Sequence, residues 1–267
     1  MSTPRVGQSR VSRIRGALTP GEWARAAAMT GAVIGLHVIG WGALLAIVVP
    51  HHYSIGTQTF GVGIGGEDRH ELEICGVDPA TRGRRMDECL AIVRALLRGE
   101  PVSFEGRFFS LRDALIVPAP SPPVPLVVGG RSDAAVRRAG WLGDGWLGIW
   151  VSPRRFASVT EQVREQAANA DRDPAGFHHA LNVWCGFGAT REAARGPLAA
   201  RMQAFYQMPF EPFERYSPYG TPADVADFLA PYVEAGCSAF NVIACADDDQ
   251  TAVAAVGELR RLLADAR

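Results

Sequence analysis

The residues with the clearest chemical potential lie in the run VVGGRSDAAVRRAG, at positions 127 to 140. An apolar strand that ends in Gly129 and Gly130 lets backbone N–H groups approach a ligand, because neither residue has a Cβ. Ser132 is expected to cap the next helix, whose N-terminus then faces the same point, and Arg131 adds a positive charge. This combination attracts phosphate. The alternative is an ordinary strand-to-helix turn with a capping serine, and spacing alone does not separate the two.

Other ionisable groups are weaker candidates for catalysis. Glu67, Asp68 and His70 follow the glycine-rich run FGVGIGG at positions 60 to 66, and such a cluster is typical of residues that act as general acids and bases. We nevertheless expect His70 to be a helix-surface residue. His178 and His179 precede a predicted strand, so they are expected at its amino end, away from a ligand. No catalytic residue is assigned.

A second group of charges, Arg82, Arg84 and Arg85, begins a predicted helix. These arginines are expected to pair with nearby carboxylates and to position that helix. One of them facing the pocket is the alternative.

Composition excludes some classes of function. The 267 residues carry a net charge of −1, which gives no basis for nucleic-acid binding. The five cysteines are scattered and form no Cys/His cluster, so we predict free thiols in a reducing, cytoplasmic compartment and no metal site.

Short apolar runs alternate with longer amphipathic ones after position 59, which predicts an α/β fold with a parallel sheet covered on its outer face. About five βα units are expected. Strands are predicted over 60–65, 125–128, 145–150, 180–187 and 239–244, a hairpin within 102–117, and helices over 81–99, 133–142, 153–170, 191–206, 221–235 and 249–266. Thr221, Pro222 and Asp224 form a strong helix start.

The first 58 residues differ in character from the rest. They combine an arginine-rich start with the run MTGAVIGLHVIGWGALLAIVVP at 29–50, which is long enough to span a bilayer. We therefore expect a hydrophobic helix and membrane contact through residues 29–50, with a cytoplasmic body behind it. A buried helix of a globular domain is the alternative.

Residues 18–63, LTPGEWARAAAMTGAVIGLHVIGWGALLAIVVPHHYSIGTQTFGVG, resemble the first transmembrane segment of nickel/cobalt permeases. That resemblance implies a metal motif of the HxxxxDH type on a following helix. No such motif follows in this chain, and one helix without its ligands does not transport a metal.

Three strings of the body occur in order: GVGIGGEDRHELEICGVDPATRGRRMDECLAIVRALLRGEPVSFEGRFF, PPVPLVVGGRSDAAVRRAGWLGDGWLG and YGTPADVADFLAPYVEAGCSAFNVI. Together they resemble luciferase-like flavin-dependent oxidoreductases over roughly 61–263, most closely the subgroup that uses deazaflavin F420. The resemblance implies a (β/α)8 barrel that binds cofactor and a small organic substrate at the carboxyl ends of its strands. It also implies hydride transfer with F420 or monooxygenation with FMN.

By that resemblance, the positions that approach the cofactor are mostly glycines at strand ends. They are Gly63, Gly65, Gly129, Gly130, Arg131, Ser132 and Gly148, with Trp146 placed equally well in the pocket or in the core.

The chain departs from the family before FGVGIG, where a complete barrel needs three more βα units. We therefore predict an incomplete barrel over 59–267 preceded by the head, 1–58, with two open sheet edges and pairing between copies as one way to cover them. The predicted function is a flavin-type oxidoreductase impaired by the missing strands. The alternatives are a membrane-anchored, non-catalytic binding protein and a nickel/cobalt transporter fragment.

Overall fold

A computed structural model describes residues 24, 60–63 and 69–265 of the chain. The chain divides into two units, Met1–Thr57 and Gln58–Arg267, and the elements described below belong to the second. The hydrophobic helix predicted at 29–50 lies outside the described residues, as do most of the head, Gly65, Glu67 and Asp68. Among the helices that are described, none is long and apolar enough to cross a membrane.

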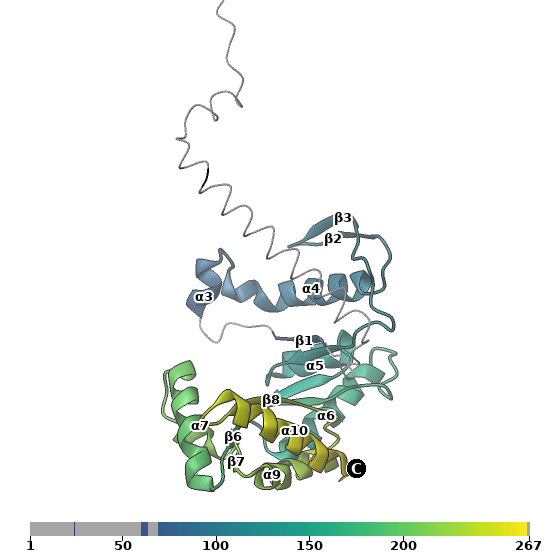
Figure 1. Ribbon diagram of the computed structural model, residues 1–267. Helices are drawn as coiled ribbons and strands as arrows, with labels where there is room; N and C mark the ends of the chain where they lie inside the picture. The colour runs from purple at the N-terminus through teal and green to yellow at the C-terminus, as the bar shows by residue number, and fades with distance from the viewer. Residues whose placement is uncertain (1–23, 25–59, 64–68, 266–267) are drawn as a thin grey trace, which may run out of the picture. The chain divides into compact units, whose positions relative to one another are not determined.

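Strands and helices alternate through the second unit, as Figure 1 shows. The strands are β1 Phe60–Val62, β2 Val102–Glu105, β3 Ser110–Ala114, β4 Leu126–Gly129, β5 Trp146–Ile149, β6 Ala180–Phe187, β7 Tyr219–Gly220 and β8 Ala239–Cys245. The helices are α3 Arg69–Ile74, the 3-10 turn η3 Pro79–Thr81, α4 Arg82–Leu96, α5 Asp133–Trp141, α6 Pro153–Ala168, α7 Arg191–Tyr206, α8 Glu211–Glu214, α9 Pro222–Glu234 and α10 Asp249–Asp265. The predicted elements are confirmed, β6 and α7 to the residue. The additional elements α3, α8 and β7 are too short to show a period in the sequence.

The main sheet is parallel, as predicted. Its order is β1-β4-β5-β6, with β8 along the other side of β6 and β7 joined to the end of β6. Within the described residues the strands form an open path from β1 to β8. The hairpin β2–β3 is a separate antiparallel pair, also as predicted.

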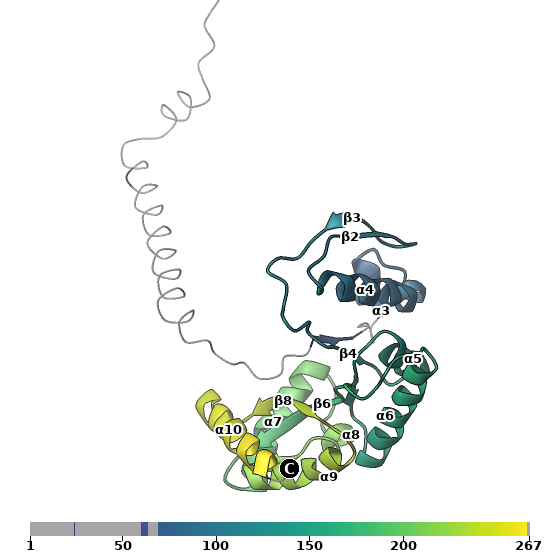
Figure 2. The same ribbon diagram turned by 90° about the vertical axis from the view of Figure 1, so that its right-hand side faces the viewer.

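Most of the core lies on the outer face of this sheet, under α5, α6, α9 and α10 (Figure 2). Leu181, Val183 and Phe187 of β6 point to this side and join Leu229 of α9 and Leu259 of α10. Each fully buried aliphatic or aromatic side chain contributes roughly 1.5–3 kcal/mol. Helix α4 packs here too, with Leu90 buried.

The opposite, inner face of the sheet carries α7. Trp184 of β6 and Cys245 of β8 point away from the outer helices and pack with Leu198 and Met202 of α7. Gly186 allows this approach, because a Cβ there would lie 2.5 Å from the carbonyl oxygen of Ala194. In a closed barrel this face would be the interior. Helices α7 and α9 lie on opposite sides of the sheet, although both occur between β6 and β8 in the chain.

Two of the predicted helix starts are confirmed in atomic detail. The Ser132 hydroxyl accepts a hydrogen bond from the backbone N–H of Ala135, 3.3 Å away. Thr221 and Asp224 form a complete capping box at the start of α9, with Pro222 at the first helical position. Such caps fix the first turn of each helix, and each is worth about 1 kcal/mol.

Two of the three arginines that begin α4 contact groups other than carboxylates. Among the described residues, Arg82 donates to the carbonyl oxygen of Pro79, and Arg85 donates to the Thr81 hydroxyl. Arg85 also lies over the ring of Phe108, 4.7 Å from its centroid. These contacts fasten the start of α4 to the preceding turn and to the hairpin, so the positioning role is retained with different partners.

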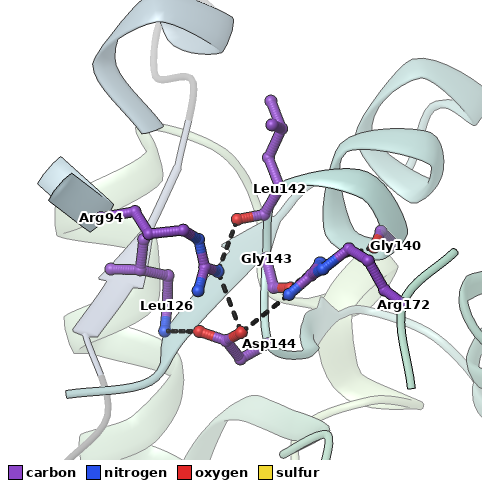
Figure 3. Close-up of polar contacts among 7 residues, drawn as sticks. All are labelled: Arg94, Leu126, Gly140, Leu142, Gly143, Asp144 and Arg172. Carbon is purple, nitrogen blue, oxygen red and sulfur yellow. Dashed lines mark hydrogen bonds and ion pairs between the residues drawn. The ribbon is translucent and has the colours of Figure 1, made fainter. Parts of the chain in front are cut away.

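One carboxylate, that of Asp144, connects four segments at the amino-terminal edge of the sheet (Figure 3). Its Oδ1 accepts from Arg94 of α4 at 2.9 Å and from Arg172, which precedes β6, at 3.0 Å. Its Oδ2 accepts from the backbone N–H of Leu126, the first residue of β4, at 2.9 Å. Arg94 also donates to the carbonyl of Leu142, and Arg172 to that of Gly140. The carboxylate thus aligns the starts of β4 and β5.

Replacing Asp144 by alanine is expected to lower the free energy of unfolding by about 3 kcal/mol, because two partly buried guanidinium groups lose their common partner. The matched control is Glu161→Ala, which removes an exposed carboxylate from its pair with Arg164 and should change stability by less than about 1 kcal/mol. Urea unfolding of both variants measures the difference. Equal, small effects in the two variants would contradict the role given to Asp144.

Candidate functional site

All strands of the main sheet that are described run in the same direction, so their carboxyl ends share one edge. Gly63 follows β1, Gly130 follows β4 and Trp150 follows β5 at this edge. Ligands of parallel α/β sheets bind at this edge, where loops and helix N-termini meet. The predicted phosphate turn is therefore on the correct side of the molecule.

The turn at Gly129–Ser132 is held in a conformation that requires glycine. Gly130 has φ +129°, and a Cβ there would lie 2.7 Å from the Cβ of Ala135 on α5. The indole Nε1 of Trp146 donates a hydrogen bond to the carbonyl oxygen of Gly130 at 2.7 Å. With Ser132 capping α5, the N-terminus of that helix begins directly after the turn. This is an arrangement that suits an anion.

Arg131 is the exposed cation of the turn. Its guanidinium carbon lies 5.6 Å from the centroid of the Trp150 ring, at the end of the neighbouring strand. This contact keeps the positive charge at the carboxyl-terminal edge, next to the helix N-terminus. A bidentate contact from Arg131 to an anionic oxygen would reinforce the backbone groups of the turn.

Trp146 and Gly148 lie in the core instead of at the ligand edge. The Trp146 side chain has no exposed surface and packs against Phe156, with ring centroids 5.4 Å apart. A Cβ on Gly148 would lie 2.9 Å from the Trp146 ring, so this glycine makes room for the indole. The core interpretation of Trp146 is the one its burial supports, and its contribution to the turn is the hydrogen bond to Gly130.

Gly63 and His70 are both exposed. Among the described residues, no atom lies within 4 Å of a Cβ built on Gly63. His70 lies on α3, as expected for a helix-surface residue. The other members of this cluster fall outside the described residues.

Trp150 was not predicted as a site residue from the sequence, although it directly follows β5, the strand that contains Trp146. It is not a glycine, yet its φ is +51°, a conformation that costs about 1 kcal/mol or more for a bulky residue. Its indole Nε1 is buried and has no hydrogen-bond partner within the part of the chain that the structure describes. The ring packs against Tyr206 of α7 and Phe213 of α8, with centroids 5.2 and 5.0 Å away. The strand-end rule that selected Gly130 would also have selected Trp150.

The amino-terminal edge has a hollow of about 350 Å³, lined in part by Arg94, Asp144 and Arg172. The charges of these three residues are already paired in the network of Figure 3. His178 lies at this hollow and His179 lies buried beside it, which agrees with their predicted placement at the start of the strand. The hollow is therefore better explained by the packing of strand starts than by a ligand.

Buried thiols offer no nucleophile. None of the five cysteines, all within the described part of the chain, forms a disulfide, and burial raises the pKa of the Cys185 and Cys245 thiols. A neutral thiol is a poor nucleophile and a poor metal ligand. Within the described residues no group of three or more histidine, cysteine or acidic side chains is arranged to hold a metal.

The fold is that of an α/β protein of barrel type, with a glycine turn and a capped helix N-terminus at the carboxyl edge of its strands. The chain belongs to the luciferase-like monooxygenase family, whose family model matches residues 51–257. The prediction of a luciferase-like oxidoreductase family is thereby confirmed, and the match begins ten residues earlier than the resemblance read from the sequence. The comparisons give no support to the permease resemblance, to a membrane anchor or to a transporter.

Relatives include an uncharacterised protein of Mycobacterium tuberculosis, 40% identical over 111 residues, which are 40% of this chain and 38% of that protein. An F420-dependent glucose-6-phosphate dehydrogenase of Beutenbergia cavernae is 37% identical over 121 residues, 44% of this chain and 36% of the relative. The same enzyme of Kineococcus radiotolerans is 26% identical over 207 residues, 68% of this chain and 60% of the relative. The chain thus spans less than two thirds of each of these relatives.

Solved structures share the fold. An F420-dependent secondary alcohol dehydrogenase in complex with an F420–acetone adduct superposes with a TM-score of 0.65 at 20% identity, covering 77% of this chain and 69% of that chain. A monooxygenase from Streptomyces bottropensis superposes with a TM-score of 0.63 at 17% identity, covering 78% and 68%. At these identities the likeness shows the fold alone.

His179 provides a test of the strand packing behind the site. It is 2% exposed, and its Nδ1 accepts a hydrogen bond from the backbone N–H of Trp146 at 3.3 Å. Burial, with smaller contributions from Arg164 and His178, lowers its pKa from 6.5 to about 4. The unfolded chain therefore takes up this proton first as the pH falls. Between pH 6.5 and 4 the free energy of unfolding should decrease by up to about 3 kcal/mol from this group.

His179→Asn keeps an acceptor for the Trp146 N–H and removes the titration. Urea unfolding of both proteins from pH 7.5 to 4.5 should show stability falling more steeply in the wild type than in the variant. Parallel curves would show that His179 is accessible to protons in the folded state.

Proposed function

We propose that this chain binds deazaflavin F420 and acts as an F420-dependent oxidoreductase on a small organic substrate. The observation that carries the proposal is the turn Gly129–Ser132, with its glycine conformation, capped helix and exposed Arg131 at the carboxyl edge. The F420-dependent relatives favour F420 over FMN. FMN, which related monooxygenases use, is the alternative that the same turn would accept.

The residues present fit an anionic cofactor. Gly130 lets the backbone approach a ligand at a position where a Cβ would clash with Ala135, and Gly63 is exposed at the end of the neighbouring strand β1. Bound F420 would supply hydride transfer, whereas reduced FMN would supply oxygen activation. The protein groups hold the phosphate at the turn, keep Gly130 in place through Trp146, and set an aromatic surface beside it with Trp150.

The described sheet corresponds to about five βα units of a (β/α)8 barrel, and its inner face is open between β1 and β8. We infer that the remaining wall of the pocket is needed for turnover, since ring-contacting side chains of a barrel come from several strands. Residues outside the described part or a second copy of the chain would have to supply it. Binding of the cofactor at the turn does not require that wall, so binding is tested on its own.

Cofactor binding is tested by titrating the full chain with F420, and in parallel with FMN, and following cofactor fluorescence. Gly130→Ala should weaken F420 binding at least tenfold, because the new methyl group clashes with Ala135 and the backbone conformation becomes strained. Arg131→Gln should weaken it about tenfold through loss of a charge-assisted contact, without a change in thermal stability.

The matched glycine control is Gly257→Ala on α10, where a Cβ has open space and helix propensity favours alanine. It should leave the dissociation constant unchanged. Wild-type protein that binds neither cofactor would contradict the proposal, and so would an unchanged affinity in the Arg131→Gln variant. Tighter binding of FMN than of F420 would assign the alternative cofactor.

A further inference from the structure

A second concave site lies on the inner face of the sheet, between β6, β8 and α7. It has a volume of about 580 Å³, within the range of pockets for small organic ligands. Its walls include Trp184 and Ile243 from the strands and Phe205 and Tyr206 from the end of α7. Asn182 and Arg201 are the polar members.

The aromatic walls suit a flat apolar group. Trp184 is only 5% exposed, and its Nε1 donates to the Tyr206 hydroxyl at 3.1 Å, so the indole is fixed in place. Phe205 lies 5.6 Å from Trp184 between ring centroids and is 68% exposed. An exposed phenylalanine beside a fixed indole gains free energy when an apolar ligand covers it.

Arg201 is the charged group of this hollow. It shares one face of α7 with Ala204 and Phe205, three and four residues further on. Within the described residues it makes no hydrogen bond and no ion pair, in contrast to Arg195 on the same helix, which pairs with Glu214 at 2.8 Å.

The hollow is connected to the phosphate turn by a series of ring contacts. Arg131 of the turn lies over Trp150, Trp150 packs against Tyr206, and Tyr206 packs against Trp184, with the last two centroid distances 5.2 and 5.9 Å. Three aromatic side chains thus join the turn to the hollow.

We propose that this hollow binds an acidic apolar molecule, an aromatic or aliphatic compound with a single carboxylate or similar anionic group. The apolar part lies against Trp184 and Phe205, and the anion pairs with Arg201, which has no hydrogen-bond or ion-pair partner among the described residues. Identifying this molecule as the substrate rests on the proposed oxidoreductase function, whereas the binding site itself does not.

The test compares two probes of the same shape, 2-naphthoate and 2-naphthalenemethanol, which differ in charge. Their binding to the full chain is measured by equilibrium dialysis with fluorescence detection of the naphthalene ring. The wild type should bind the carboxylate about tenfold more tightly than the alcohol. Arg201→Gln should remove that preference and leave the alcohol unchanged, whereas Phe205→Ala should weaken both probes.

Arg260→Gln, which removes an exposed arginine from the outer helix α10, is the matched control and should keep the tenfold preference. Equal binding of the two probes to the wild type would overturn the proposal, and so would a preference that survives in Arg201→Gln. F420 is titrated into the same preparations. Loss of naphthoate discrimination with intact F420 binding refutes this site alone, and failure to bind F420 with intact discrimination refutes the proposed cofactor alone.

Discussion

The Asp144 carboxylate is the constraint on which the positions of the strands depend. It joins α4, the start of β4 and the segment before β6 through two arginines and one backbone N–H. Because β4 and β5 are short and parallel, fixing their starts also fixes where they end. The turn after β4 and Trp150 after β5 are consequently placed side by side at the opposite edge.

The two edges of the sheet differ in how their polar groups are satisfied. At the amino edge, Arg94 and Arg172 share Asp144, and the His179 side chain accepts a hydrogen bond from the backbone of β5. These polar groups stabilise the fold. At the carboxyl edge, Arg131 is exposed beside a helix N-terminus and the Trp150 Nε1 has no partner among the described residues. A buried polar atom without a partner occurs at each edge, since His179 Nε2 at the amino edge also lacks one among the described residues. The exposed Arg131 beside a helix N-terminus is therefore the feature that favours the second edge for an anionic ligand.

Much of the fold could be predicted because its signals are local. The apolar run of β6, the cap at Ser132 and the capping box at Thr221 each have a physical cause within a few residues. The orientation of β5 was not predictable in the same way. Its residues are apolar or glycine on both faces, so alternation does not show that Trp146 points to the core and Leu147 to the inner face.

The position of α7 could have been inferred from the sequence. Three helices, α7, α8 and α9, and the short strand β7 lie between the parallel strands β6 and β8, and of the two long helices only one can form the outer crossover. The other, α7, packs on the inner face through Gly186 and brings Arg201 and Phe205 to the hollow. The positive φ of Trp150 has no local signature, because it is imposed by packing against Tyr206 and Phe213.

The central claim is that the turn at Gly129–Ser132 and the start of α5 hold an anionic cofactor. Hydrogen–deuterium exchange of the full chain with and without F420 tests it directly, because backbone amides that contact a ligand exchange more slowly. The account predicts slower exchange across residues 129–136 when F420 is added, with residues 172–178 at the opposite edge unchanged. Slower exchange confined to 172–178, or no change at 129–136 at saturating F420, would contradict it.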